Sequence, residues 1–381
     1  MKIEILSSIH AINQEDWDSC ALQKKTGLNP FCSYGFLSAL EESGCAIAET
    51  GWLAQHIIVR NEQERICAIM PLYLKSHSQG EYVFDHSWAN AFENAGGKYY
   101  PKLQCSIPFS PVTGPRLMVH PDAPEMETKL LLVEGAVTLA KKLGISSLHF
   151  TFLAKEDGDV MASNQFLIRQ DQQFHWLNNG YLSFNQFLEA LSSRKRKNII
   201  KERRCALQND IEIETVKADE ISEDHWDHYF EFYLNTANRK WGRPYLNREF
   251  FSLLSQKIPD NLVLIMAKRN DQYIAGALNL IGHDTLFGRY WGATEHHKFL
   301  HFEVCYYQAI EFAIHNKLEK VEAGAQGDHK LARGYVPVVT QSAHWISNPS
   351  FREAIDNFLK QERSMVQQDI EYLENFTPFK K

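Results

Sequence analysis

The sequence predicts a mixed α/β (α+β) protein in which one unit of sheet and helix occurs twice. Two stretches each show the order strand, turn, strand, helix and strand, and Pro71-Leu-Tyr-Leu74 holds the same place in the first as Ala277-Leu-Asn-Leu280 holds in the second. A chain of 381 residues with 44% hydrophobic composition is also too long for one ordinary core. We therefore expect two tandem domains, residues 1–170 and 171–381, each a mixed central sheet flanked by helices.

Hydrophobic spacing predicts the elements of the first half. Apolar residues recur at helical spacing over 125–143, and Gly144 follows as a C-cap. The other predicted elements are a strand at 3–6, a polar turn at 13–16, a helix at 34–43, a hairpin of strands 55–60 and 65–77, and a strand at 147–153. Residues 80–118 are rich in Gly, Pro and aromatic residues without a clean period, which is typical of a binding surface or a lid.

The second half centres on a hairpin, a polar elbow at 295–300, a helix and a strand. The predicted elements are strands at 173–177, 212–216, 274–281, 285–294 and 320–326, and helices at 183–208, 222–238, 247–257, 302–318 and 350–376. A polar loop with Asp328, His329, Lys330 and Arg333 follows the last strand. The helix at 350–376 packs on the body in the simpler interpretation, and a partner-binding helix is the alternative.

Composition excludes several classes of function. The seven cysteines are scattered without a CxxC pair, and the adjacent His296 and His297 lack a third ligand nearby, so we expect no metal. The N-terminus has charges where a signal peptide would be apolar, and no apolar run has the length of a membrane span, so we expect a cytoplasmic protein.

Charge is unevenly distributed along the chain. The net charge is −7, yet residues 194–204 hold seven Lys or Arg and one Glu, a local +6 that leaves −13 for the rest. The cations from Arg194 to Arg204 could bind tRNA or donor phosphates, and a solvated, salt-bridged helix face is the alternative.

Several motifs resemble a known family, the tandem GCN5-related acetyltransferase (GNAT-like) proteins grouped with Fem-type peptidyltransferases, specifically the Fem-like predicted N-acyltransferases. The motifs are Pro71-Leu-Tyr-Leu-Lys-Ser-His77, Gly80-Glu-Tyr-Val-Phe-Asp-His86, Tyr99-Tyr-Pro-Lys-Leu103, Pro111-Val-Thr-Gly-Pro-Arg-Leu117, Asp171-Gln-Gln-Phe-His-Trp176, Arg239-Lys-Trp-Gly-Arg-Pro-Tyr245, His301-Phe-Glu-Val-Cys-Tyr306 and Ala323-Gly-Ala-Gln-Gly-Asp-His-Lys330. The resemblance implies two GNAT-like domains and transfer of an acyl group from a thioester or aminoacyl ester to an amine.

The resemblance also implies where the donor binds. The strands at 288–294 and 320–326 would splay around the donor, and residues 295–304, at the start of a helix, would receive its phosphates. The donor-binding residues expected there are Trp291, Gly292, Ala293, Glu295, His301, Phe302, Glu303 and Val304. Acyl-CoA, such as acetyl-CoA, is the favoured donor.

Transfer to an amine requires a base, a polarised carbonyl and a proton for the leaving group. We expect Glu322 to act as the base, with Tyr290 or His329 as the proton donor. The expected substrate-binding residues are Asp85, His86, Trp88, Arg239, Trp241, Arg243, Asn279, Arg289, Gly324, Gln326, Lys330 and Arg333.

The sequence therefore predicts an N-acyltransferase that acts on a small-molecule or peptide amine, such as a cell-wall-type peptide. Two alternatives stay open. One is an aminoacyl-tRNA-dependent peptidyltransferase of the Fem type, and the other is a non-catalytic protein that binds a peptide or a peptidoglycan precursor.

Overall fold

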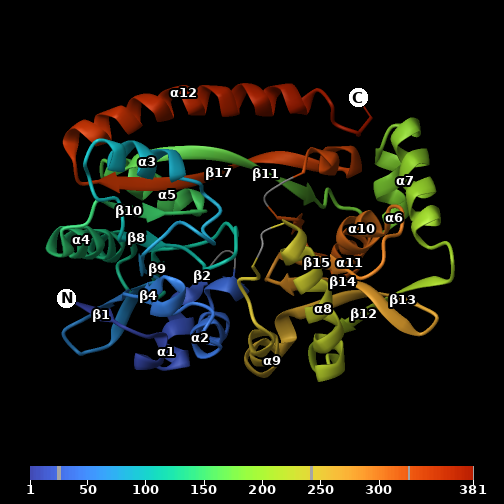
Figure 1. Cartoon of the computed structure of the whole chain (residues 1–381), viewed down its shortest axis with the longest axis horizontal. Helices are drawn as coiled ribbons and strands as arrows, with labels where there is room; N and C mark the ends of the chain where they lie inside the picture. Colours follow the sequence, from blue (N-terminus) through green and yellow to red (C-terminus); the bar gives the residue numbers. More distant parts are fainter. Residues whose placement is uncertain (24–26, 241–242, 325–326, 381) are drawn as a thin grey trace. The chain divides into compact units, whose positions relative to one another are not determined.

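A computed structural model describes residues 1–23, 27–240, 243–324 and 327–380 (Figure 1). Its contacts divide the chain into two compact units. Unit 1 comprises Met1–Asp171 and Val339–Gln368, and unit 2 comprises Gln172–Val338 and Asp369–Lys381. Three elements continue from one unit into the other along the chain: β11 (Leu167–Leu177), β17 (Tyr335–Ile346) and α12 (Pro349–Glu374).

Unit 1 is built on two groups of strands. Its elements in chain order are β1 (Lys2–Leu6), α1 (Gln14–Ala21), β2 (Leu22–Gln23), β3 (Gly27–Leu28), α2 (Tyr34–Glu42), β4 (Trp52–Ala54), β5 (His56–Arg60), β6 (Ile66–Met70), β7 (Tyr73–Lys75), α3 (His86–Asn94), β8 (Lys102–Cys105), β9 (Met118–Val119), α4 (Glu125–Leu143), β10 (Ser147–Phe150) and α5 (Lys155–Ser163). One group has the order β1-β5-β6-β9, and the other has the order β17-β10-β8-β7-β4, in which only β10 and β8 are parallel.

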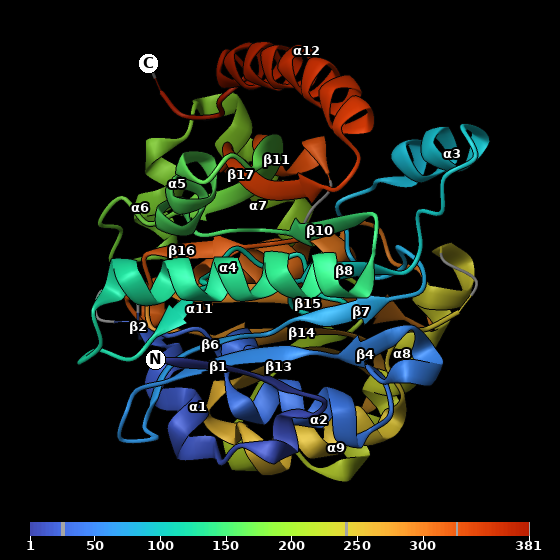
Figure 2. The ribbon, with the colours of Figure 1, turned by 90° about the vertical axis from the view of Figure 1, so that its left-hand side faces the viewer.

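Helix α4 packs on the strands of unit 1 and forms its main core (Figure 2). Leu132, Ala136 and Leu139, spaced by three or four residues, lie buried in that core together with Leu103 and Leu148. The helix has the predicted bounds, and Gly144 ends it in the left-handed conformation (φ 62°) that glycine adopts without steric cost.

Two predictions for unit 1 need correction. The stretch at 65–77 forms two strands in different sheets, β6 paired with β5 and β7 paired with β4 and β8. Pro71, which has no N–H to donate, lies at the break. The polar turn at 13–16 is the start of α1, where the Asn13 side chain accepts a hydrogen bond from the Asp16 amide.

Unit 2 has a sheet covered by helices on both faces. Its elements are α6 (Phe184–Ala190), α7 (Ser193–Ala206), β12 (Ile211–Lys217), α8 (Glu223–Lys240), α9 (Arg248–Lys257), β13 (Leu262–Arg269), β14 (Gln272–Ile281), β15 (Thr285–Ala293), α10 (Leu300–Phe302), the π-helix η6 (Glu303–Tyr307), α11 (Gln308–His315), β16 (Lys320–Glu322) and the 3-10 helix η7 (Asp328–Arg333). The strand order is β12-β13-β14-β15-β16-β11, and only β15 and β16 are parallel.

Sequence alternation explains the two layers on this sheet. Ala275 and Ala277 of β14 face the side covered by α10 and η6, whereas Gly276 between them faces Tyr229 and Phe232 of α8. The hairpin of β14 and β15 is confirmed by their antiparallel register. The predicted helix at 183–208 is two helices, α6 and α7, which are separated at Leu191 and Ser192.

Candidate functional site

The strand pair β15 and β16 opens after three residue pairs. Thr285, Leu286 and Phe287 pair with Lys320, Val321 and Glu322, and among the described residues the pairing ends there. Strand β15 continues to Ala293 paired only with β14. The backbone from Gly288 onwards therefore has a free side that faces away from β14, and a ligand amide can form hydrogen bonds with that side.

A bulge in β15 accompanies this opening. Leu278 pairs with Arg289 and Ala277 with Trp291, so Tyr290 is an extra residue, and its φ is 29°. The Tyr229 hydroxyl donates to the Tyr290 carbonyl at 2.8 Å. The Tyr290 ring packs on Tyr233 of α8, with 5.3 Å between ring centroids. The role of Tyr290 as a proton donor stays a prediction.

Gly292 has a packing role that the sequence did not reveal. A Cβ at this position would lie 1.9 Å from the Phe232 carbonyl oxygen, so the backbones of β15 and α8 approach too closely for any side chain. The neighbouring Trp291 packs on His301, with 5.3 Å between ring centroids.

Glu322 lies at the opening of the two strands and is buried. Its Oε1 lies 3.6 Å from Lys320 Nζ and 4.0 Å from His175 Nδ1, while its Oε2 has no hydrogen-bond partner. His175 of β11 is the direct register partner of Glu322, so the two side chains share one face of the sheet. Burial lowers the pKa of His175, although the charge of Glu322 opposes this. A buried carboxylate oxygen without a partner is costly, and binding a substrate N–H group would satisfy it.

His175 was not among the predicted site residues. It is a lone histidine in sequence and lies far along the chain from Glu322, and only the pairing of β11 with β16 brings the two together.

Cationic groups gather beside the same opening. Lys330 of η7 is buried, and its Nζ donates to the Gly324 carbonyl at 2.9 Å. Burial, aided by the nearby charge of Arg289, lowers the pKa of Lys330 to about 7. Gly324 has a φ of 78°, and a Cβ there would lie 3.8 Å from Arg289 Nη1. The structure thus brings together four predicted site residues: Glu322, Arg289, Gly324 and Lys330.

Asn279 lies on β14 next to this group. It pairs with Gly288 and is buried. A Cβ added to Gly288 would lie 3.4 Å from the Oδ1 of Asn279. Trp241 and Gln326 lie outside the described residues. Arg239 and Arg243 are exposed in unit 2.

The start of the helix after β15 differs from the predicted phosphate site. Glu303 is fully buried, and Arg203 of α7 donates to it at 2.8 and 3.1 Å. Val304 is buried in the core. Glu295 accepts hydrogen bonds from Arg269, which lower the pKa of its carboxyl group to about 2. The side chains of Glu303 and Glu295 thus have protein partners, and their role as donor contacts stays a prediction.

Aromatic and cationic side chains surround the end of η7. His329 is exposed, and its Nε2 lies 2.9 Å from the Tyr306 hydroxyl. The Arg333 guanidinium lies 3.4 Å from the centroid of the Phe302 ring and donates to Glu202 at 2.8 Å. Arg333 is therefore engaged by the protein, and its predicted contact with an acidic substrate is untested.

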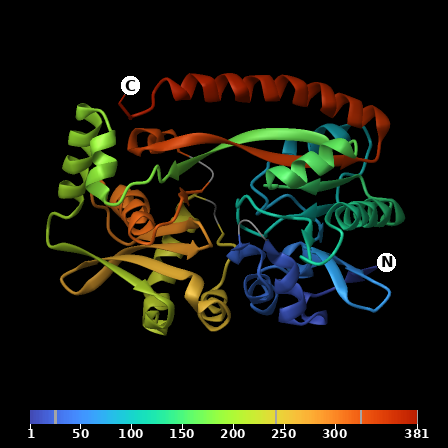
Figure 3. The same cartoon turned by 180° about the vertical axis from the view of Figure 1, so that it is seen from behind.

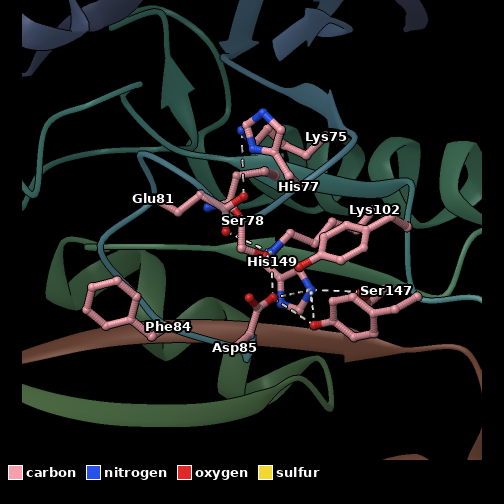
Figure 4. Close-up of polar contacts among 12 residues, drawn as sticks. Lys75, His77, Ser78, Glu81, Phe84, Asp85, Lys102, Ser147 and His149 are labelled. Carbon is pink, nitrogen blue, oxygen red and sulfur yellow. Dashed lines mark hydrogen bonds and ion pairs between the residues drawn. The ribbon is translucent and has the colours of Figure 1, made fainter. Parts of the chain in front are cut away.

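Asp85 belongs to a buried polar cluster in unit 1 (Figure 4), and the buried Trp88 packs beside this cluster on His149 and His344. Lys102 donates to Ser78 and Glu81, each at 2.7 Å, and to Asp85. Burial alone would raise the pKa of Asp85, but the charge of Lys102 and the hydrogen bonds that Asp85 accepts together hold the pKa well below its ordinary value. His86 is exposed and stacks on Phe84 instead.

The cluster extends across the polar face of the unit 1 strands. Tyr99 donates to Asp85 at 2.7 Å, and its hydroxyl lies 3.3 Å from His149 Nε2. His149 Nδ1 lies 2.7 Å from His344 Nδ1, and Trp88 packs edge-on against His344. Burial lowers the pKa of His149 to about 3, so both imidazoles are neutral at neutral pH. Polar and apolar residues alternate in β8 and β10, and this alternation is the signal that could have indicated the face from the sequence.

Among the described residues, no group of three His, Cys, Asp or Glu residues could hold a metal ion. No helix in the described part of the chain combines the length and the apolar character needed to cross a bilayer.

Comparison with known proteins places this geometry in context. FemX matches with a TM-score of 0.56 and 13% identity, covering 93% of this chain and 100% of that one. A conserved protein of unknown function from Bacteroides thetaiotaomicron matches at 0.54 and 13%, covering 91% and 100%. L-PGS from Bacillus licheniformis matches at 0.51 and 8%, covering 84% and 95%. These structures support the predicted fold class, a mixed α/β chain.

No curated protein sequence matches the chain. The FemAB-like family, described as peptidoglycan biosynthesis and recognition, matches residues 8–381. Because this match spans nearly the whole chain, the protein belongs to the FemAB-like family.

Proposed function

We propose that the protein transfers an acyl or aminoacyl group from an ester or thioester donor to a primary amine, at the opening between β15 and β16. The observation that carries this proposal is that the unpaired Oε2 of Glu322 lies where β15 loses its neighbour. A free strand edge can bind the amide backbone of a donor, and the adjacent carboxylate can accept the proton of an attacking amine.

The chemistry needs three groups that the site provides. The amine nitrogen attacks the donor carbonyl carbon, and Glu322 takes the proton that the nitrogen loses. Lys330 and Arg289 stand beside the same opening and would stabilise the negative charge on the carbonyl oxygen. When the carbonyl re-forms, the C–O or C–S bond breaks, and the proton held by Glu322 passes to the leaving oxygen or sulfur. The sum is one amide formed and one ester or thioester cleaved.

The acceptor class follows from the family. A family described by peptidoglycan biosynthesis and recognition supports an amine-bearing peptide of the peptidoglycan-precursor type. Acyl-CoA is the first donor to test, because the sequence resembles GNAT-like acyltransferases. One observation favours an aminoacyl ester of tRNA as a second candidate: the first helical turn after β15 is followed at once by Glu303, a buried carboxylate bound to Arg203, where a phosphate would be expected to bind.

The proposal is tested by mass-spectrometric detection of product. The protein is incubated with acyl-CoAs or aminoacyl-tRNAs and with amine acceptors that include peptidoglycan-type peptides. We expect one donor and acceptor pair to give an amide. Glu322→Gln should lower its rate at least ~100-fold, the typical contribution of a positioned base.

Glu319→Gln is the matched control, because Glu319 is exposed near the start of the same strand and should leave the rate unchanged. Equal rates for both variants would remove Glu322 from the mechanism. Binding of a donor or peptide without any product would favour the non-catalytic alternative.

A further inference from the structure

Helix α7 has one face packed against the rest of unit 2 and one face in solvent (Figures 1 and 3). On the bound face, Ile199 and Ala206 are buried, Arg203 pairs with Glu303, and Glu202 accepts from Arg333. Part of the basic run is therefore structural, as the salt-bridged alternative for this stretch predicted.

The solvent face keeps four cations. Arg194, Lys197, Lys201 and Arg204 are exposed, and none of them has an ion-pair partner among the described residues. Their spacing of three, four and three residues places them on one side of the helix, over about 15 Å. This row of cations belongs to a chain with a net charge of −7, so the attraction for anions is local.

Aliphatic side chains adjoin this row. Ile200 is 51% exposed and Leu207 is 39% exposed, and they lie seven residues apart on one flank of the same face. Exposed branched aliphatic residues beside clustered cations are typical of a helix that lies on a membrane surface. Nucleic acid would engage the cations through phosphates but would leave both aliphatic side chains in water.

We propose that this face of α7 docks on the surface of an anionic lipid bilayer. Basic residues near such a surface are attracted to its anionic head groups, and insertion of Ile200 and Leu207 adds a second, hydrophobic contribution. Two such contributions together give stable but reversible attachment. This proposal does not depend on the transferase activity, and it would hold for a non-catalytic binding protein as well.

Vesicle co-sedimentation tests the proposal. We expect the full chain to bind vesicles of mixed phosphatidylglycerol and phosphatidylcholine, to bind pure phosphatidylcholine vesicles at least tenfold more weakly, and to dissociate as salt rises. Lys197→Glu with Lys201→Glu should lower binding at least tenfold. All six side chains exchanged in this test and its controls are exposed, so the variants should fold, which circular dichroism checks.

The controls separate lipid from other polyanions. Lys141→Glu with Lys142→Glu makes the same charge change at exposed positions of α4 and should leave binding unchanged. Ile200→Ser with Leu207→Ser should weaken vesicle binding without altering binding of tRNA. Failure to bind anionic vesicles would overturn the proposal. If such a protein instead bound tRNA, and Lys197→Glu with Lys201→Glu abolished that binding, the face would be assigned to nucleic acid.

Discussion

Both units contain a strand, a helix and a second strand parallel to the first, and the two versions differ at one point. In unit 1, β8 leads through α4 to β10, and their pairing continues to Cys105, the last residue of β8. In unit 2, β15 leads through α11 to β16, but β15 extends six residues beyond Phe287, its last residue paired with β16. The same motif is closed in one unit and open in the other.

The buried charges show the same contrast. In unit 1, Lys102 lies between Glu81 and Asp85 and donates a hydrogen bond to one oxygen of each, while Glu81 Oε1 and Asp85 Oδ1 have no hydrogen-bond partner. In unit 2, Glu322 keeps an oxygen without a hydrogen-bond partner, and Lys330 donates to one carbonyl. Carboxylates that each accept a hydrogen bond from a buried cation help to hold a fold together, whereas Glu322, whose Oε1 lies 3.6 Å from Lys320 Nζ, is available to a ligand. We infer that unit 1 uses its polar residues for structure and unit 2 for chemistry.

Removing the central cation of unit 1 should produce the largest change in stability. Lys102→Met leaves two buried carboxylates without their cation and should lower the free energy of unfolding by about 3–5 kcal/mol. Urea unfolding measures the loss. Lys360→Met removes an exposed ion pair with Asp356 and should cost at most about 1 kcal/mol. Similar losses for the two variants would break the contrast between the units.

Exchanging a carboxylate for an amide should affect the two units differently. Asp85→Asn weakens bonds from Lys102 and Tyr99 and should cost about 3 kcal/mol of unfolding free energy. Glu322→Gln should cost less than about 1 kcal/mol, because its nearest charged groups, Lys320 and His175, lie 3.6 and 4.0 Å from its Oε1, beyond hydrogen-bond distance. Thermal and urea unfolding compare the two. A larger loss for Glu322→Gln would assign that carboxylate a structural role.

Lys330 should make stability depend on pH on the alkaline side. Its pKa is lowered from 10.5 to about 7, so the fold favours the neutral amine; the resulting stabilisation is complete above about pH 10.5 and is lost as pH falls through 7. The unfolding free energy of the wild type relative to Lys330→Met should therefore rise between pH 7 and pH 9. A constant difference across this range would contradict the lowered pKa.

Glu81 should have the opposite pH dependence in unit 1. Burial raises its pKa from 4.5 to about 7, so its stabilisation is present below about pH 4.5 and is lost as pH rises through 7. Glu81→Gln should remove this slope from the curve of unfolding free energy against pH between pH 4.5 and 7. An unchanged slope would show that Glu81 is not the titrating group.

The smallest effect concerns a glycine at the open end. Gly324→Ala places a side chain at a positive φ and should cost about 1 kcal/mol of unfolding free energy. Gly144→Ala, also at positive φ and with open space around it, should cost a similar amount. Transfer activity should fall only in Gly324→Ala, because its methyl group lies near Arg289. Equal activity of the two variants would show that the space at Gly324 is not used.

Much of the fold could be predicted from local patterns. Helix α4 was predicted to its end residues because its apolar spacing and its terminal glycine agree, and β14 and β15 because turn residues separate two apolar runs. Helix α3 and strand β8 were missed, because β8 is buried on both faces with Lys102 and Gln104 on one of them. The break before α7 depends on a bond from the Ser192 amide to the Pro378 carbonyl, which no local pattern reveals.

The candidate site could be predicted only in part. Glu322, Arg289 and Lys330 lie near one another, and the sequence indicated them as polar residues of the last strand, of the strand before it and of the loop that follows. His175 and Glu303 could not be assigned, since their neighbours are set by distant segments: β16 for His175 and α7 for Glu303. Pairing between distant segments decides which buried polar groups are left without a hydrogen-bond partner. The local pattern of a single sequence does not show which segments will pair.

Hydrogen exchange with and without a donor tests the central claim most directly. If the donor lies along the open part of β15, amides within Gly288–Ala293 should exchange more slowly when the donor that supports transfer is bound. The amides of β8 and β10 in unit 1 should not change, because their pairing is already complete. Protection confined to unit 1, with none between Gly288 and Ala293, would contradict the proposal that unit 2 performs the chemistry.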